Sequence, residues 1–307
     1  MQNQCAEAFD CKMPCYHPLL AYKLDGKVTF NKPFAYAKGF NLPCGQCIGC
    51  RLSYSRQWAI RCVHEAQMHK ESCFITLTFS PEEMAKRDNP ASLDVTEFQR
   101  FMKRLRKKHG KVRFFHCGEY GEKNKRPHYH ALLFGLDFKD KELFSRRDDV
   151  RLYTSQSLSE LWPHGFSTIG EVNFESAAYV ARYVMKKVRG EGAEEYYSNW
   201  IDPVTGEVTD VKPEYATMSR KPGIGYDWFK EYKDDVFPHD YCVVRGHEVR
   251  PPRYYETLLS QDELAEVKAK RRENMPEVYD QYDERMDRLW VSQEVKLEAL
   301  KRLVRDL

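Results

Sequence analysis

The sequence predicts an α+β fold with a mainly antiparallel central sheet flanked by helices. Short β-branched and aromatic runs alternate with amphipathic helical segments, and two of these runs are close enough in sequence to pair as a hairpin. The chain has 307 residues, 42% of them hydrophobic, which is sufficient for a folded core. We expect four parts: a Cys-rich N-terminal unit at 1–50, a core at 51–190, a loop-rich extension packed on the core at 191–260, and a charged helical tail at 261–307.

The first half of the predicted core contains two helices and one buried strand. A four-residue recurrence of apolar positions from Tyr54 to Ala66 predicts a helix that begins near Arg51. Residues 73–79 have the β-branched and aromatic composition of a strand. Asp94 or Thr96 is the expected N-cap of the next helix, which ends before Gly110 and buries Phe98, Phe101, Met102 and Leu105.

The second half of the core is predicted to hold three strands and a final helix. Residues 112–117 and 127–134 pair as an antiparallel hairpin with a long turn, and a charged connection and a short helix lead to a strand at 165–172. Asn173 or Ser176 caps a helix that continues to Arg189. Beyond it, 191–260 has no clear period, and the polar tail from residue 262 fits one or two helices interrupted near 274–276.

Composition restricts the class of protein. The net charge is only +3, no run approaches the length of a membrane-spanning helix, and the start lacks the basic-then-apolar pattern of a secretion signal. We therefore expect a soluble, intracellular protein. Ten cysteines in such a chain are expected to be thiols or metal ligands and not a disulfide framework.

A pair of histidines marks a candidate metal site. In an extended strand His128 and His130 project to the same side, and Glu119, at the end of the neighbouring strand, can supply a carboxylate oxygen for a divalent cation. Glu122 is the alternative third ligand. An ordinary edge strand with two solvated histidines explains the pattern without a metal.

Two tyrosines mark a candidate nucleophile. In the predicted helix after residue 173, Tyr179, Tyr183 and Lys187 recur every four residues, opposite the apolar arc that includes Ala177 and Val180. Exposed phenols among the basic residues Arg182 and Lys186 indicate an anionic partner. Near a metal-bound phosphate, a phenol oxygen can attack phosphorus.

A cluster of cysteines marks a candidate structural metal site. Cys44, Cys47 and Cys50 have the spacing C-x2-C-x2-C, and Cys15 or Cys11 can supply a fourth thiolate. Tetrahedral Zn²⁺ fits such a set in a segment that is too poor in apolar residues to order itself. An iron–sulfur cluster and a group of free thiols are the alternatives.

Basic and aromatic residues elsewhere suggest contacts with nucleic acid. Arg104, Lys107 and Lys108 lie on the polar face of the helix at 95–109, which is a track for phosphates or a solvated surface. Aromatic residues of the extension can stack on unpaired bases or pack in a core. They are Tyr226, Trp228, Phe229, Tyr232, Tyr254 and Tyr255.

The chain resembles a known enzyme superfamily. Residues 74–79, 126–134 and 178–187 resemble, in this order, the three motifs of the HUH endonucleases that initiate rolling-circle replication. Residues 44–51 and 55–59 are similar to replication initiators of microvirus phages, especially the gokushovirus branch. The resemblance covers about residues 13–190 and implies an HUH fold, whose sheet is also that of RNA-recognition-motif proteins.

The resemblance implies an endonuclease that nicks single-stranded DNA at a phage origin through a 5′-phosphotyrosine and rejoins the ends. His128 and His130 match the histidines that bind Mg²⁺ or Mn²⁺, Tyr179 and Tyr183 match the two nucleophiles, and Lys187 matches a lysine beyond them. The implied partners are single-stranded or supercoiled origin DNA, a host helicase and a DNA polymerase, in the host bacterial cytoplasm and without a membrane. A non-enzymatic, zinc-containing single-stranded-DNA-binding protein is the alternative from another class, and an HUH relaxase or transposase is the alternative within the superfamily.

Overall fold

The chain forms two compact units. One consists of residues 1–56, 238–251 and 256–307, and the other of residues 57–237 and 252–255. Helix α2 (Ile48–Gln67) contributes to both. The computed structural model describes residues 15–121, 124–147, 150–183, 187–188, 190–201, 206–237, 239–273 and 282–301.

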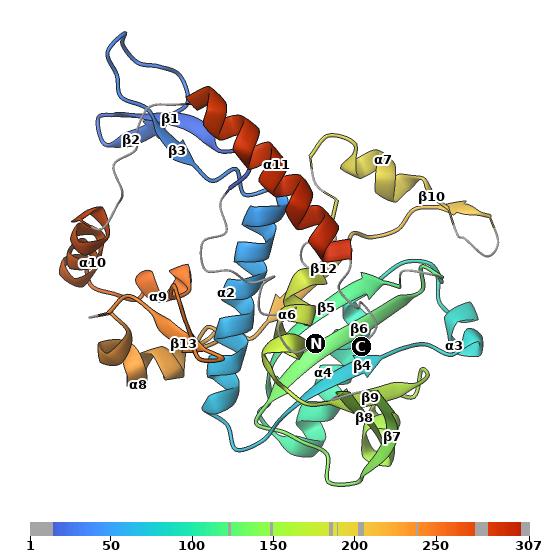
Figure 1. Cartoon of the computed structure of the whole chain (residues 1–307). Coiled ribbons are helices and arrows are strands. Elements are labelled where there is room, and N and C mark those ends of the chain that lie inside the picture. Colours follow the sequence, from blue (N-terminus) through green and yellow to red (C-terminus); the bar gives the residue numbers. More distant parts are fainter. Residues whose placement is uncertain are drawn as a thin grey trace. The chain divides into compact units, whose positions relative to one another are not determined.

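A seven-stranded sheet forms the centre of the larger unit (Figure 1). Its strands follow the order β12-β5-β6-β4-β9-β8-β7, and each neighbouring pair is antiparallel. The prediction of an α+β fold with a mainly antiparallel sheet is thereby confirmed. The strands are β4 (Ser72–Leu77), β5 (Arg113–Tyr120), β6 (Pro127–Phe134), β7 (Lys141–Arg147), β8 (Val150–Ser155), β9 (Ser167–Gly170) and β12 (Tyr215–Met218).

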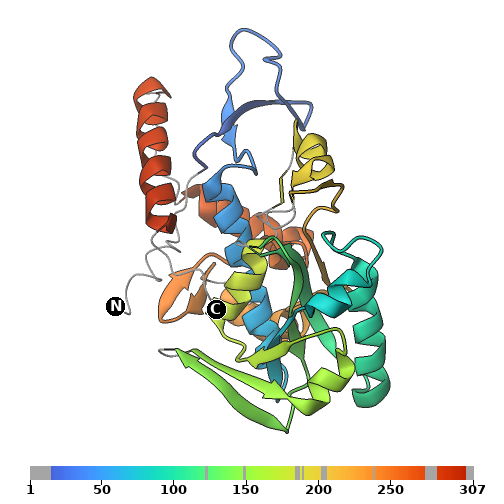
Figure 2. The same cartoon turned by 90° about the vertical axis from the view of Figure 1, so that its right-hand side faces the viewer.

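Helices cover both faces of this sheet (Figure 2). Helix α4 (Val95–His109) packs on one face, together with the short helices α3 (Pro81–Ala85) and α5 (Gln156–Leu161). Helix α6 (Phe174–Tyr183) packs on the other face, against β5 and β6. The main hydrophobic core therefore lies between the sheet and α4. It includes Phe98, Phe101, Met102 and Leu105 of the helix and Ile75, Leu77, Tyr129, Leu133 and Ile169 of the sheet.

Helix α4 begins and ends where the sequence indicates. The Asp94 carboxylate accepts a hydrogen bond from the backbone N–H of Thr96 at 3.0 Å, which satisfies one of the free donors of the first turn. At the other end Gly110 adopts a φ of 80°, which is strained for residues that carry a Cβ. The four apolar residues predicted for its buried face are all buried.

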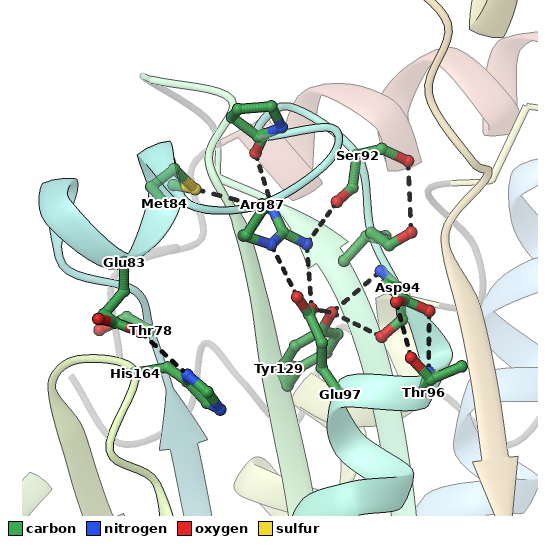
Figure 3. Close-up of polar contacts among 12 residues, drawn as sticks. Thr78, Glu83, Met84, Arg87, Ser92, Asp94, Thr96, Glu97, Tyr129 and His164 are labelled. Carbon is green, nitrogen blue, oxygen red and sulfur yellow. Dashed lines mark hydrogen bonds and ion pairs between the residues drawn. The ribbon is translucent and has the colours of Figure 1, made fainter.

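A polar network ties the start of α4 to β6 (Figure 3). The Arg87 guanidinium donates to both carboxylate oxygens of Glu97, at 2.7 and 3.0 Å, and to the carbonyl oxygens of Pro90 and Ser92. Tyr129 of β6 donates its hydroxyl to the Asp94 carbonyl oxygen at 2.9 Å and also contacts the Glu97 carboxylate. The residue between His128 and His130 is therefore anchored on the α4 side of the sheet.

Three elements of the larger unit were not predicted. The segment described above as a charged connection forms the β7–β8 hairpin, whose exposed residues on both faces give no clear alternation of polarity. Strand β12, from the extension, pairs with β5, and helix α8 (Tyr226–Val236) follows it. The extension also contains helix α7 (Ala193–Ser198) and the strands β10 (Trp200–Ile201) and β11 (Val208–Thr209).

Several aromatic residues of the extension pack in an interior. Phe229 and Tyr255 are buried, and the ring of Trp228 stacks on His64 of α2 with a centroid distance of 3.4 Å. The Tyr255 hydroxyl forms a 2.8 Å hydrogen bond with His64 Nδ1, and burial lowers the pKa of this histidine to about 3. For these side chains core packing is the observed role.

The smaller unit contains short strands and two longer helices. Strands β1 (Leu19–Leu24), β2 (Lys27–Thr29) and β3 (Phe40–Leu42) form an antiparallel sheet in the order β2-β1-β3. The predicted tail interruption at 274–276 lies outside the described residues. None of the helices in the described part of the chain combines the length and apolarity needed to cross a membrane. The remaining elements are β13 (Cys242–Val244), β14 (His247–Val249), α9 (Arg253–Glu256), α10 (Gln261–Glu273) and α11 (Tyr282–Lys301), with α9 extending into both units.

Candidate active site and metal sites

The predicted hairpin brings three candidate metal ligands together. Strands β5 and β6 pair so that Glu119 lies opposite His128 and Cys117 lies opposite His130. Side chains of directly opposed residues share a face, and alternate residues along a strand do the same. Glu119, His128 and His130 therefore all project to the face that carries α6.

The three side chains converge on one carboxylate oxygen. Glu119 Oε1 lies 2.7 Å from His128 Nε2 and 2.9 Å from His130 Nε2. Because an ionised carboxylate only accepts, both ring nitrogens donate to it. Ligands of a six-coordinate Mg²⁺ or Mn²⁺ ion lie about 3 Å apart, so this donor set fits such an ion.

The second nitrogen of each imidazole has its own partner. His128 Nδ1 donates to the backbone carbonyl oxygen of Arg126 at 3.1 Å, and His130 Nδ1 lies 3.0 Å from the Thr76 hydroxyl on β4. Such bonds hold the ring orientation and favour the tautomer whose Nε2 lone pair is free for a cation. The arrangement is typical of histidines that bind metals.

Burial and charge favour a cation at this position. The Glu119 side chain is 2% exposed and His130 is 5% exposed, whereas His128 is 18% exposed and leaves one side of the cluster accessible. Burial alone raises the pKa of Glu119, but hydrogen bonds from the two histidines lower it to about 2. A buried carboxylate that stays ionised requires a positive partner.

Helix α6 directs a tyrosine toward these histidines. Asn173 caps the helix, since its side chain accepts from the Ser176 N–H at 2.8 Å and Ser176 Oγ accepts from the Asn173 N–H. The Tyr179 ring meets the His130 ring edge-on, with centroids 5.2 Å apart and an interplanar angle of 89°. The Arg182 guanidinium lies 6.0 Å from the centre of the same tyrosine ring. The predicted pairing of a phenol with the imidazoles is thus present for Tyr179.

The position of Tyr179 on its helix differs from the sequence prediction. Tyr179 is half-buried against His130 and Phe74 and not exposed opposite the core, because α6 lies across the sheet and presents a wide arc to it. Ala177, Val180 and Ala181 are buried as predicted.

The predicted helix to Arg189 is not observed. Helix α6 ends at Tyr183, whose side chain lies outside the described part of the structure, as do Lys186 and Arg189. Lys187 is described but is not helical, so it does not extend the line of tyrosines. The neighbouring Val188 N–H donates to the Tyr197 hydroxyl at 2.9 Å, a contact with α7 that sequence periodicity cannot reveal.

The predicted basic track on α4 lies away from this cluster. Arg104, Lys107 and Lys108 belong to the helix on the opposite face of the sheet. Arg104 donates to the Leu161 carbonyl oxygen at 2.9 Å, and Lys108 approaches Glu160 at 3.5 Å. Arg104 therefore supports the packing of α5, and the contact of Lys107 and Lys108 with DNA stays a prediction.

Four cysteines of the smaller unit form a second cluster. The sulfur atoms of Cys15, Cys44, Cys47 and Cys50 all lie within 4.8 Å of one another, and Cys15 Sγ is 3.9 Å from Cys47 Sγ. Sulfur ligands of tetrahedral Zn²⁺ lie about 3.8 Å apart, as Zn–S bonds of about 2.3 Å require. The described part of the chain thus selects Cys15 as the fourth member, and Cys11 lies outside it.

Backbone donors surround these sulfur atoms. The N–H groups of Cys44 and Cys47 donate to Cys15 Sγ at 3.1 Å and to Cys44 Sγ at 3.2 Å, and the Tyr16 N–H donates to Cys47 Sγ at 3.3 Å. Burial disfavours the Cys47 thiolate, but backbone N–H groups and neighbouring thiols lower its pKa to about 7. Such donors stabilise thiolates, the form that binds metals. The four remaining described cysteines, Cys62, Cys73, Cys117 and Cys242, are buried as small apolar side chains.

The sequence comparisons decide the family. A family model of replication-associated proteins, which is named after the ORF2 protein, matches residues 72–188. The replication-associated protein VP4 of Bdellovibrio phage phiMH2K is 32% identical over 295 residues, which cover 89% of this chain and 88% of the relative. The chain belongs to the family of phage replication-associated proteins.

Two further members of this replication-associated family support the assignment. The replication-associated protein ORF2 of Spiroplasma virus 4 is 30% identical, with 74% of this chain and 70% of the relative covered. ORF4 of Chlamydia phage 1 is 31% identical over 72% of this chain and 54% of the relative. The resemblance to replication proteins of microvirus-like phages is confirmed, and no solved structure gives a significant match.

The segment matched by the family model contains the candidate active site. It begins with β4 and ends at Val188, and thus includes Thr76, Glu119 and Tyr179 as well as both histidines. Sequence reasoning missed the role of Thr76. The signal available for it was a polar residue within the otherwise apolar strand at 73–79, but its partner on β6 follows only from the register.

Proposed function

We propose that this replication-associated protein is an endonuclease that initiates rolling-circle replication of a phage genome. It nicks single-stranded DNA at the origin and later rejoins the ends. The observation that carries the proposal is the edge-on approach of Tyr179 to His130 beside the Glu119 carboxylate. Family membership supports a role in phage replication, and this geometry supports the chemistry.

In the proposed reaction, a phenol oxygen of Tyr179 or Tyr183 attacks the origin phosphorus. A bond forms between the tyrosine oxygen and phosphorus, and the bond from phosphorus to the preceding 3′ oxygen breaks. The phenol loses a proton and the departing 3′ oxygen gains one, which leaves a 5′-phosphotyrosine and a free 3′-hydroxyl. Because the phosphodiester energy is kept in the new bond, a 3′-hydroxyl reverses the step without a nucleotide cofactor.

The residues around Tyr179 have distinct roles in this proposal. Mg²⁺ or Mn²⁺ held by Glu119, His128 and His130 polarises the scissile phosphate and stabilises charge on the leaving oxygen. Thr76 and the Arg126 carbonyl group orient the histidines. Arg182 contributes positive charge near the phosphate, and Lys187 and Lys186 are further candidates for that role. The substrate is unpaired or supercoiled origin DNA in the host cell, where a helicase and a polymerase extend the free 3′ end.

The cysteine cluster is proposed to hold a structural Zn²⁺ ion. Four thiols at distances that match tetrahedral coordination, with N–H groups directed at three of them, support this role. A closed set of four sulfur ligands leaves no open position for catalysis, so the ion stabilises the fold of the smaller unit.

A denaturing gel tests the proposed chemistry. The purified chain is incubated with a labelled single-stranded origin oligonucleotide and Mg²⁺, and a covalent protein–DNA band is expected. Changing Tyr179 and Tyr183 together to Phe abolishes this band, while the matched change Tyr232→Phe on α8 leaves it intact. A band of normal yield from the double variant contradicts the mechanism. Absence of any band from the parent, with DNA binding retained, favours a non-enzymatic DNA-binding protein.

A further inference from the structure

Two exposed phenylalanines lie close together at the end of the sheet. Phe144 belongs to β7 and Phe166 directly precedes β9, and their side chains are 57% and 48% exposed. Their ring centroids are 5.0 Å apart with an interplanar angle of 57°. Neither ring belongs to the main core. An ordered pair of exposed aromatic rings is a candidate contact surface.

The strand register places Phe166 on the same face as the histidines. Thr76 of β4 lies opposite both His130 on β6 and Thr168 on β9, so these three side chains point to one face. Phe166 is two residues before Thr168 and continues that face. Phe144 contacts Phe166, so the pair lies on the side of the sheet that carries α6.

The pair also lies at the same end of the sheet as His128. The backbone N–H and the hydroxyl of Thr78 both donate to the Phe166 carbonyl oxygen, at 2.9 and 2.8 Å. Leu77, the residue before Thr78, pairs with Tyr129, the residue after His128. Since one strand separates β6 from β9, about 10 Å of sheet lies between the metal cluster and the aromatic pair.

The local backbone and charge suit a nucleic acid. The register of β7 against β8 shifts between Leu143 and Ser145, and such a bulge redirects the side chain at Phe144. The hairpin projects from the sheet on the side of α6 (Figure 2). Arg146, Arg147 and Arg151 are exposed on it, and no ion pair joins them to any other residue that the structure describes. The acidic residues of this hairpin are Glu142, which is also exposed, and two turn aspartates outside the described residues.

We propose that Phe144 and Phe166 form a stacking platform for the bases of the unpaired DNA strand beside the scissile phosphate. This inference rests on the proposed function, because it assigns further contacts to the same DNA substrate. The hairpin arginines hold phosphates while the rings stack on bases. Since every base has a π face, the platform binds the strand without reading its sequence and complements whatever contacts recognise the origin.

Binding measurements with matched variants test the platform. Fluorescence anisotropy with a labelled oligothymidine in EDTA reports affinity without cleavage. The double variant Phe144→Ala/Phe166→Ala is expected to raise the Kd at least about tenfold. Leu143→Ala is the control, because Leu143 is 59% exposed on the same strand and pairs with Tyr153, which packs on the α4 side. Its Kd is expected to stay within about twofold of the parent, since it presents no ring.

An abasic scan identifies the stacked bases. Removing single bases from the oligonucleotide should weaken binding to the parent at one or two positions, and the same removal should not weaken binding to the double variant. The variant Phe144→Leu/Phe166→Leu, which keeps apolar bulk, should behave like the alanine variant if stacking is the interaction. A double variant that binds as tightly as the parent overturns the proposal, as does one that changes only the oligomeric state in sedimentation.

The outcomes separate this inference from the proposed function. A parent chain that forms the covalent adduct, with ring variants that bind DNA normally, refutes the platform alone. A parent chain that forms no adduct refutes the endonuclease, whatever the ring variants show. Circular dichroism of the variants checks that the hairpin substitutions leave the fold intact.

Discussion

At the scale of single residues, His130 is the side chain on which the candidate site depends most. It contacts Glu119 through one ring nitrogen and Thr76 through the other, and it meets the Tyr179 ring edge-on. The first contact follows from a hairpin that the sequence predicts. The second crosses to β4, a neighbour of β6 that is distant in sequence. A pattern such as H-x-H therefore predicts the ligands but not the hydroxyl that orients them.

Replacing Thr76 with Val tests this orienting contact. The methyl group keeps the shape of the side chain but removes the partner of His130 Nδ1, and loss of such an outer contact weakens metal affinity or activity about 10- to 100-fold. The Mn²⁺ concentration at half-maximal adduct formation should rise accordingly. Thr76→Ser should restore it, and an unchanged half-maximal concentration in Thr76→Val would refute the role.

A comparison of two basic residues tests which face of the sheet meets DNA. Arg182 lies beside Tyr179 on the α6 face, whereas Lys107 is exposed on α4, on the other face. Because the proposed chemistry occurs on the α6 face, Arg182→Ala should lower adduct yield at limiting DNA about fivefold or more. Lys107→Ala should change it less than about twofold. Equal losses would show that DNA also follows α4.

At the scale of elements, the network around Arg87 fixes the strand that bears the histidines. Arg87 and Glu97 are 9% and 12% exposed, and Tyr129 joins them from β6. Removing one partner of a largely buried ion pair leaves the other charge without compensation. Glu97→Ala should therefore lower the free energy of unfolding by about 3 kcal/mol.

The control for this prediction is an exposed ion pair elsewhere. Glu160→Ala removes the partner of Lys108, and because both side chains are exposed the loss should stay below about 1 kcal/mol. Denaturant titrations of both variants provide the comparison. Equal losses would mean that the Arg87 network does not stabilise the fold.

The packing of α2 gives a pH prediction. Glu65 of α2 is 1% exposed and accepts from Arg113 and from the Gly225 N–H. Burial raises the pKa of Glu65, but its bonds to His69, Arg113 and Gly225 lower it to about 2. A carboxylate whose pKa is lower in the folded state stabilises the fold above its unfolded pKa, near 4.5, and loses that contribution as the pH falls toward 2.

The variant Glu65→Gln isolates this contribution. Its free energy of unfolding should fall below that of the parent by about 3 kcal/mol at pH 7, the amount that a shift of this size represents. The difference should shrink as the pH is lowered from about 4.5 toward 2. A difference that is independent of pH would contradict the assignment.

The sequence predicts elements with a clear period better than elements whose structure depends on distant partners. The caps Asp94 and Asn173, the hairpin of β5 and β6 and the buried face of α4 were predicted because their determinants are local. The end of α6 at Tyr183 was not, since apolar positions continue in the sequence while Val188 bonds to Tyr197 instead. Strand β12 pairs with β5 across about 100 residues, which no local pattern indicates.

At the scale of the whole molecule, the two units hold two different metal-binding chemistries. The larger unit has a nitrogen and oxygen set suited to Mg²⁺ or Mn²⁺, and the smaller unit has four thiols suited to Zn²⁺. Spacing alone left Cys15 and Cys11 as alternatives for the fourth thiol, because the chain between them and Cys44 has no fixed path in the sequence. The fold brings Cys15 to the other three.

Metal removal should therefore affect the two units differently. Elemental analysis is expected to find one Zn²⁺ per chain and no iron, and Cys47→Ser should lower that content and expose the smaller unit to proteolysis. EDTA followed by Mn²⁺ should abolish and then restore adduct formation by the parent. Full zinc retention in Cys47→Ser, or an iron signal, would contradict the structural zinc site.

The most direct test of the endonuclease is the identity of the residue bound to DNA. Trypsin cuts after Arg182 and so separates Tyr179, in the peptide 152–182, from Tyr183, in the peptide 183–186. Mass spectrometry of the covalent adduct, after nuclease digestion, should find a 5′-nucleotide on one of these two tyrosines. A nucleotide on any other residue, or a nicked origin with no nucleotide on either peptide, would contradict the proposed mechanism.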